Sequence, residues 1–78
     1  MLNVKVLGPG CANCRRLEAL VRKVASERGV EVDVEKVTDY AQIIRWSVMA
    51  TPGLVVNETR VSSGRIPSEA EIAGWLQA

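Results

Sequence analysis

The chain has 78 residues, the size of one small domain, and we expect residues 1–78 to form a single domain. Hydrophobic residues make up 47% and charged residues 24% of the chain, a balance that excludes a disordered protein. The formal net charge is +1, with basic and acidic residues interleaved, so no nucleic-acid partner is expected. No stretch approaches the roughly 18 apolar residues of a membrane span, so no membrane partner is expected either.

The first residues lack the charged and apolar segments of a signal peptide, which predicts a cytoplasmic protein. In that reducing compartment, a close-spaced cysteine pair is more often redox-active or metal-binding than structural. Closing so short a loop would also remove little entropy from the unfolded chain. Histidine, the commonest metal ligand, is absent.

The first half of the chain predicts a strand, a helix and a second strand. Residues 2–7 place apolar and polar side chains on opposite faces of a strand. Residues 12–28 have apolar side chains at helical spacing, and Gly29 is a natural residue to end that helix. Residues 30–35 alternate strictly and predict another strand. Two strands joined by a crossover of this length are expected to be parallel.

A second, shorter helix is predicted to begin at Asp39, which has the spacing of a capping box with Gln42. Trp46 falls on a different face of this helix from its predicted inward stripe. That stripe consists of Tyr40, Ile43, Ile44 and Ser47.

The remaining residues predict a hairpin followed by a third helix. Residues 54–56 and 59–62 are the expected strands, joined by a turn at Asn57–Glu58. Ser68 and Glu71 form a second capping box, which marks the start of the last helix. The predicted order of elements is therefore β-α-β-α-β-β-α.

Both cysteines, Cys11 and Cys14, lie at the junction of the first strand and the first helix, spaced Cys-x-x-Cys. The first turn of a helix has unpaired backbone N–H groups and the positive end of the macrodipole, and both stabilise a thiolate. We therefore expect the pKa of Cys11 to lie below the ordinary value of about 8.5, helped by Arg15 one turn on. Cys14 is expected to be more buried. This asymmetry predicts that Cys11 attacks a disulfide and that Cys14 resolves the product.

Three segments carry a family resemblance: residues 6–14 with the Cys-x-x-Cys motif, residues 48–52 with Thr51-Pro52, and residues 62–67. With these motifs in this order, the chain resembles the thioredoxin superfamily, and most closely the small glutaredoxin-sized redox-active disulfide proteins of bacteria and archaea. The resemblance implies an α/β, thioredoxin-like fold. Its four-stranded mixed sheet would have the order 2-1-3-4, with the first and third helices on one face and the second on the other.

The resemblance also implies a site. Pro52 would follow a cis peptide bond and lie against the dithiol, and the backbone of Thr51 would pair with an extended peptide. Further site-lining residues are expected at Gly10, Ala12, Asn13 and Met49, although for Met49 filling a gap in the core is the safer interpretation. The redox-active Cys11–Cys14 disulfide would be the only redox group, with no other cofactor and no metal. The expected partners are a disulfide-containing protein or small molecule and a recycling reductase or low-molecular-weight thiol, acting on a monomer.

The chain departs from the thioredoxin pattern at three places. Thioredoxins have Trp before the first cysteine and Gly-Pro between the two, where this chain has Gly10 and Ala12-Asn13. They also keep a buried Asp six positions before the first cysteine, and an ungapped count from Cys11 reaches Lys5. Without that carboxylate, proton transfer to and from Cys14 would depend on water or on a basic neighbour.

These observations favour a thiol–disulfide oxidoreductase, an enzyme in which Cys11 is the nucleophile and Cys14 the resolving cysteine. The alternative is a carrier of a soft metal or metalloid (Cu, Hg or As) that uses the same two thiolates. A mononuclear zinc site is disfavoured, because zinc normally takes four ligands and the chain has two cysteines and no histidine. A third hypothesis is an interaction module of the same fold without turnover.

Overall fold

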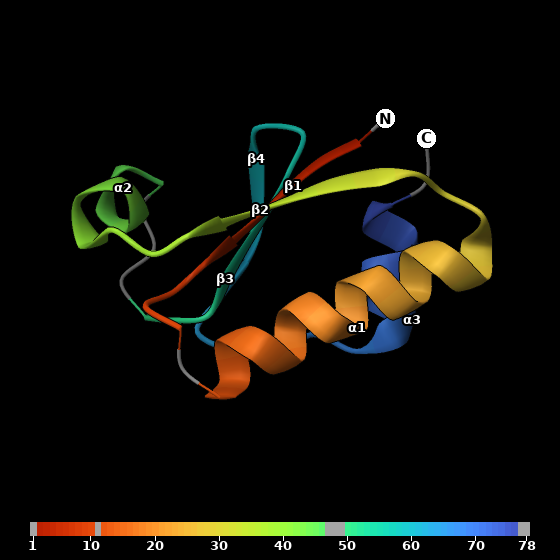
Figure 1. Ribbon diagram of the computed structural model, residues 1–78, viewed down its shortest axis with the longest axis horizontal. Coiled ribbons are helices and arrows are strands. Elements are labelled where there is room, and N and C mark those ends of the chain that lie inside the picture. The colour runs from red at the N-terminus through yellow and green to blue at the C-terminus, as the bar shows by residue number, and fades with distance from the viewer. Residues whose placement is uncertain (1, 11, 47–49, 77–78) are drawn as a thin grey trace.

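The computed structural model describes residues 2–10, 12–46 and 50–76. Figure 1 shows the arrangement of its elements, which follow the predicted order β-α-β-α-β-β-α. In chain order they are β1 (Leu2–Leu7), α1 (Ala12–Arg28), β2 (Val32–Val37), α2 (Tyr40–Arg45), β3 (Gly53–Val56), β4 (Thr59–Ser63) and α3 (Glu69–Trp75).

The four strands form one mixed sheet in the order β2-β1-β3-β4, as predicted. Strands β1 and β2 are parallel, with Leu2 opposite Val32 and Leu7 opposite Val37. Strand β3 runs antiparallel to both β1 and β4. The turn at Asn57–Glu58 has positive φ at both residues (48° and 66°), the geometry of a type I′ hairpin.

Helix α1 ends at a Schellman motif, and this motif shifts the start of β2. Gly29 has φ of 66° and donates its N–H to the Ser26 carbonyl at 3.2 Å. Val30 donates its N–H to the Ala25 carbonyl at 2.9 Å. The prediction that a strand begins at residue 30 was therefore wrong by two residues, because Val30 closes the helix and pairing with β1 begins at Val32.

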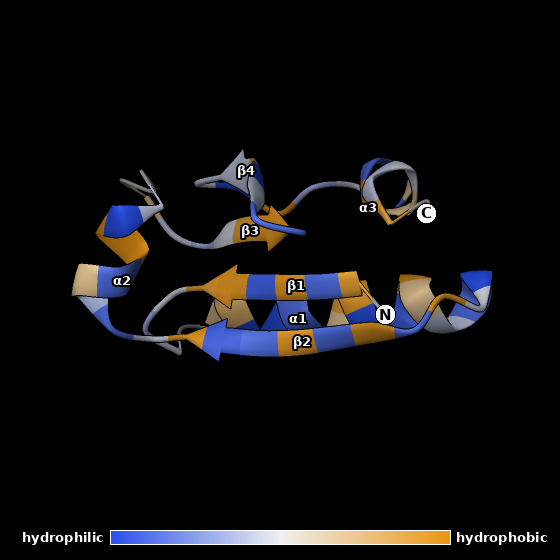
Figure 2. Ribbon diagram, turned by 90° about the horizontal axis from the view of Figure 1, so that it is seen from above, coloured by the Kyte–Doolittle hydropathy of each residue, from blue (hydrophilic) through white to orange (hydrophobic). Residues whose placement is uncertain are grey.

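Each face of the sheet has its own apolar cluster. Helices α1 and α3 lie side by side along one face (Figure 1), as the contacts between them confirm. Their cluster takes Val4, Val6 and Leu54 from the sheet. The alternate side chains Leu7 and Val55 form the second cluster with α2, on the other face. Figure 2 shows α2 near the carboxyl ends of β1 and β2, and the alternating hydropathy along both strands.

The predicted inward stripe of α2 was wrong at two positions. Tyr40 and Ile44 are 63% and 64% exposed, and Ile43 is buried with Trp46 packed beside it. Ile43 and Trp46 lie three residues apart on one row of the helix, whereas Tyr40 and Ile44 form the adjacent row. So short a helix, placed at one end of the sheet, buries one row only. Ser47, the fourth predicted member, lies outside the described residues.

Helices α2 and α3 begin at the predicted capping residues. Asp39 caps α2 by accepting a hydrogen bond from the N–H of Ala41 at 2.8 Å. Ser68 and Glu71 make both hydrogen bonds of the predicted capping box of α3. Glu71 also pairs with both terminal nitrogens of Arg65, at 3.0 and 2.8 Å. The hydrogen bonds from Arg65 and from the Ser68 backbone lower the pKa of Glu71 to about 2.

We expect Ser68→Ala to lower the free energy of unfolding by about 1 kcal/mol, because it removes the side-chain acceptor for one N–H of the first turn. Urea denaturation measures this loss.

The pKa of Glu71 is lowered in the folded state, so its stabilising contribution is present above the ordinary pKa of 4.5 and is lost as the pH falls towards 2. Glu71→Gln should therefore flatten the pH dependence of stability in that window. Unchanged urea midpoints for both variants at pH 7 would contradict this role of the cap.

Candidate functional site

The predicted site lies where β1 ends, α1 begins and the chain enters β3. Cys14 is in the first turn of α1 and is 5% exposed, as buried as the sequence predicted. Its sulfur is disulfide-bonded. Cys11 and Met49, predicted as the nucleophile and as a site-lining residue, lie outside the described residues.

Gly8, which follows β1, is the point where the Cys14 and Thr51 side chains meet. A Cβ atom built on Gly8 would collide with the Cys14 Sγ. The same atom would lie 3.3 Å from the Cys14 Cβ and 3.6 Å from the Thr51 Cβ. The Gly8 N–H donates to the Val37 carbonyl at 2.9 Å, which fixes this backbone beside β2. The space that Gly8 leaves empty therefore lets the cysteine and the threonine approach one backbone segment.

Thr51 and Pro52 are joined by a cis peptide bond. Thr51 is half-buried and Pro52 is completely buried. The Pro52 carbonyl accepts a hydrogen bond from the N–H of Gly64 at 2.9 Å, which ties this segment to the end of β4. Gly64 has φ of 76° and lies close to Ala50, since a Cβ there would be 3.1 Å from the Ala50 Cβ. The hairpin thus holds Thr51 in place next to Gly8.

Three further predicted residues flank the buried cysteine on the molecular surface. Gly10, Ala12 and Asn13 are all exposed, Gly10 with φ of 91°. These three residues precede Cys14 along the chain and face solvent, while the Cys14 side chain turns inward. The exposed surface next to Cys14 therefore includes these three residues.

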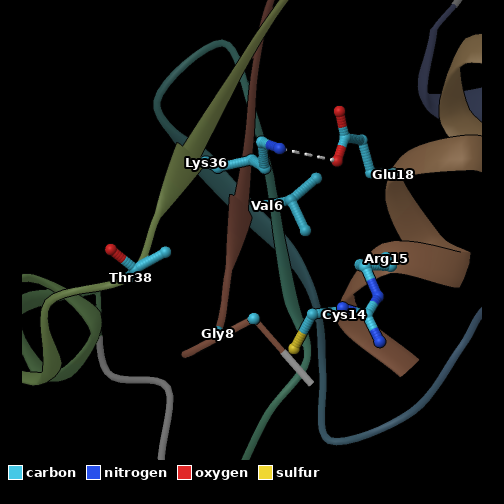
Figure 3. Close-up of a pocket in the computed structure, with 8 residues that line it drawn as sticks. Val6, Gly8, Cys14, Arg15, Glu18, Lys36 and Thr38 are labelled. Carbon is cyan, nitrogen blue, oxygen red and sulfur yellow. Dashed lines mark ion pairs between the residues drawn. The ribbon is translucent and has the colours of Figure 1, made fainter. Parts of the chain in front are cut away.

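A small cavity adjoins Cys14 on the α1 side of the sheet (Figure 3). Its walls include Val6 from β1, Gly8 just after β1, and Lys36 from β2. Helix α1 contributes Glu18 one turn after Cys14. The Glu18 carboxylate pairs with the Lys36 ammonium group at 3.5 Å, the dashed line in Figure 3. Glu18, Lys36 and Gly8 were not predicted from the sequence as residues of the site. Glu18 could have been found from its four-residue spacing to Cys14, which places both side chains on one side of the helix.

Lys5, the residue that an ungapped count places at the family's buried Asp, lies on the opposite face of the sheet. Val6 borders the cavity, so alternation along β1 turns Lys5 towards α2. There the Lys5 ammonium group lies 5.6 Å from the centre of the Trp46 ring and 3.1 Å from the Glu58 carboxylate. Lys5 therefore is not a basic neighbour of Cys14 that could exchange a proton with it.

The chain matches the thioredoxin domain family over residues 2–77. It is 36% identical to a thioredoxin of Methanothermobacter thermautotrophicus over 72 residues, 92% of this chain and 94% of that protein. It is also 36% identical to a thioredoxin of Methanocaldococcus jannaschii over 78 residues, 100% of this chain and 90% of that protein. The chain therefore belongs to the thioredoxin domain family, a membership that supports a general thiol–disulfide oxidoreductase role.

A solved structure has the same fold. It is a thioredoxin-2 described as a component of malaria parasite protein secretion machinery, with a TM-score of 0.68 and 16% sequence identity. The match covers 95% of this chain and 79% of that one. Within the described part of this chain, no helix is both long and apolar enough to cross a membrane.

Proposed function

We propose that this protein is a thiol–disulfide oxidoreductase in which Cys11 is the nucleophile and Cys14 the resolving cysteine. The observation that carries the proposal is the position of Cys14, buried in the first turn of α1, with Gly8 between it and Thr51 of the cis Thr51–Pro52 segment. Membership in the thioredoxin domain family supports the same chemistry.

The proposed reaction begins with the reduced protein. The Cys11 thiolate attacks a substrate disulfide, forms a mixed disulfide and releases one substrate thiol. Cys14 then attacks the Cys11 sulfur, which releases the second substrate thiol and leaves the Cys11–Cys14 disulfide. Two electrons pass from the dithiol to the substrate, and a reductase or a low-molecular-weight thiol returns them. The unpaired N–H groups and the dipole of α1 favour the thiolate in the first step.

The proposed substrate segment is an extended peptide that pairs with the backbone of Thr51. Two observations support this binding mode. Thr51 is held between Gly8 and the Gly64–Pro52 hydrogen bond, so its position is fixed before a substrate arrives. Gly10, Ala12 and Asn13, which precede Cys14 closely along the chain, are exposed, so a substrate can reach this surface. We place Met49 at this surface as part of the same proposal.

Reduction of a protein disulfide by a small dithiol, with and without this protein, tests the proposed activity. Catalytic amounts of the wild type are expected to accelerate the reduction. With Cys11→Ser the rate should equal that measured with the dithiol and no protein, because the attacking sulfur is gone. Ser63→Ala, on the exposed end of β4, is the control expected to behave as wild type. Equal inertness of the wild type and Cys11→Ser would contradict the proposal.

The soft-metal hypothesis makes a different prediction for the same two sulfurs. In residues 2–10, 12–46 and 50–76, no group of three or more His, Cys, Asp or Glu side chains gathers to hold a metal ion. A carrier would therefore hold Cu(I), Hg(II) or As(III) through the thiolates of Cys11 and Cys14. Protection of both thiols from alkylation at one equivalent of metal is the expected result for a carrier. Unprotected thiols would contradict that hypothesis.

A further inference from the structure

The cavity beside Cys14 contains a carboxylate that the proposed reaction has not yet used. Glu18 lies four residues after Cys14 on α1, so both side chains project from the same side of the helix. Both border the cavity, and Figure 3 shows the Cys14 sulfur directed towards Gly8 with Glu18 one turn further along the helix. The buried sulfur of Cys14 and an acidic side chain therefore border one small cavity.

Among the described residues that line the cavity, Glu18 is the acidic one. On β1 the cavity wall is Val6, which has no titratable group, and Lys5 points to the other face. The side chain of Glu18 is 16% exposed, far less than the side chains of its partners Lys36 and Arg22, at 63% and 56%. The Glu18 side chain is thus half-buried, and its more exposed partners pair with it at the rim of the cavity.

Two cationic groups pair with this carboxylate, and a third borders the same cavity. Arg22 donates to Glu18 from Nε and from a terminal nitrogen at 3.2 and 3.1 Å, Lys36 pairs with it at 3.5 Å, and Arg15 borders the same cavity. Burial raises the pKa of Glu18, but the hydrogen bonds and charges of Arg22 and Lys36 outweigh it, so the pKa lies below the ordinary value of 4.5. At neutral pH the group is therefore an anion, the state that accepts a proton.

The cavity has a volume of about 20 Å³, enough for about one water molecule. Building on the function proposed above, we propose that Glu18 accepts the Cys14 proton through water in this cavity when Cys14 attacks the mixed disulfide. It returns a proton to Cys14 when the Cys11–Cys14 disulfide is reduced. The carboxylate that β1 lacks is thereby supplied by helix α1, from the residue one turn after the resolving cysteine.

The step balances without another reactant. The Cys14 thiol gives its proton through water to the Glu18 carboxylate, and the sulfur electron pair forms the bond to the Cys11 sulfur. The bond between Cys11 and the substrate sulfur breaks, and its electron pair leaves with the substrate sulfur. Glu18 then releases its proton to water or to that departing thiolate. Because the pKa of Glu18 is far below that of a thiol, the proton stays on Glu18 only briefly.

The test separates the two chemical steps with an aromatic disulfide, 5,5′-dithiobis(2-nitrobenzoic acid), whose thiolate product is coloured. In stopped flow, the first equivalent of colour reports attack by Cys11 and the second reports resolution by Cys14. We expect Glu18→Gln to leave the first phase unchanged and to slow the second about tenfold or more at pH 7. In the variant, the second phase should accelerate about tenfold per pH unit up to the pKa of the Cys14 thiol, since hydroxide must replace the carboxylate.

Two further variants distinguish proton transfer from a loss of structure. Glu27→Gln changes an exposed acid on the same helix, away from the cavity, and should match the wild type in both phases. Glu18→Asp keeps the carboxylate and should restore a second phase with the wild-type dependence on pH. If the second phase of Glu18→Gln has the rate and pH profile of the wild type, the proposed role of Glu18 is overturned, but the proposed function is not. A wild type that releases no second equivalent would overturn the proposed function, and the role of Glu18 with it.

Discussion

Gly8→Ala is expected to disrupt the site, because the added methyl group would collide with the Cys14 Sγ. The new atom would also lie 3.3 Å from the Cys14 Cβ, so the first turn of α1 or the end of β1 must move. Overpacking of this kind costs about 1–3 kcal/mol of stability. We expect a loss of that size in urea denaturation, together with a loss of most disulfide reductase activity.

The matched control is Gly74→Ala, on the exposed face of α3. Apart from its chain neighbours and the backbone of its own helix, no described atom lies within 4 Å of a Cβ added at Gly74, and the position is inside a helix. Alanine there should raise the free energy of unfolding by up to about 1 kcal/mol and leave the activity unchanged. If Gly8→Ala were as stable and as active as the wild type, the contact between Gly8 and Cys14 would have no role in the site.

Cys14→Ser is expected to trap the protein in covalent linkage with its substrate. Cys11 can still attack, but no second thiolate is available to release the mixed disulfide. With a peptide disulfide and no added thiol, mass spectrometry under non-reducing conditions should show one adduct per chain, with the mass of one substrate thiol. Turnover in the presence of a small dithiol should fall towards the rate of the dithiol alone.

The reverse variant provides the comparison for this experiment. Cys11→Ser should form no adduct under the same conditions, because the remaining sulfur, that of Cys14, is 5% exposed. An adduct on Cys11→Ser of the same yield would show that Cys14 reacts directly with substrates. That outcome would contradict the assignment of nucleophile and resolving cysteine.

The fold was predictable because its local signals agree with its tertiary packing. Alternation in β1 places Val4 and Val6 against α1 and α3, and helical spacing in α1 buries Leu17 and Val21 against the same face. The orientation of α2 was not predictable in this way. Its apolar residues occupy two adjacent rows, and only the position of the helix at the end of the sheet decides that Ile43, and not Tyr40, is buried.

The candidate site was predictable where its residues form a local motif or a family motif. Cys14 was expected from its motif, and Thr51 and Pro52 were expected from the resemblance. Gly8 and Glu18 were not predicted, because their significance comes from contacts between elements. Gly8 matters through its distance to Cys14 and Thr51, and Glu18 through the cavity that α1 forms with β1 and β2.

The most direct test of the proposed chemistry is the redox equilibrium of the pure protein in glutathione buffers of graded composition. The account predicts one reversible two-electron transition, in which two thiols per chain become unreactive to alkylation together and glutathione is not retained. The transition should be absent from Cys11→Ser and from Cys14→Ser. Cys14→Ser should instead retain one glutathione on Cys11. Two wild-type thiols that remain alkylatable across every buffer, or a transition without retained glutathione in either variant, would contradict a Cys11–Cys14 redox couple.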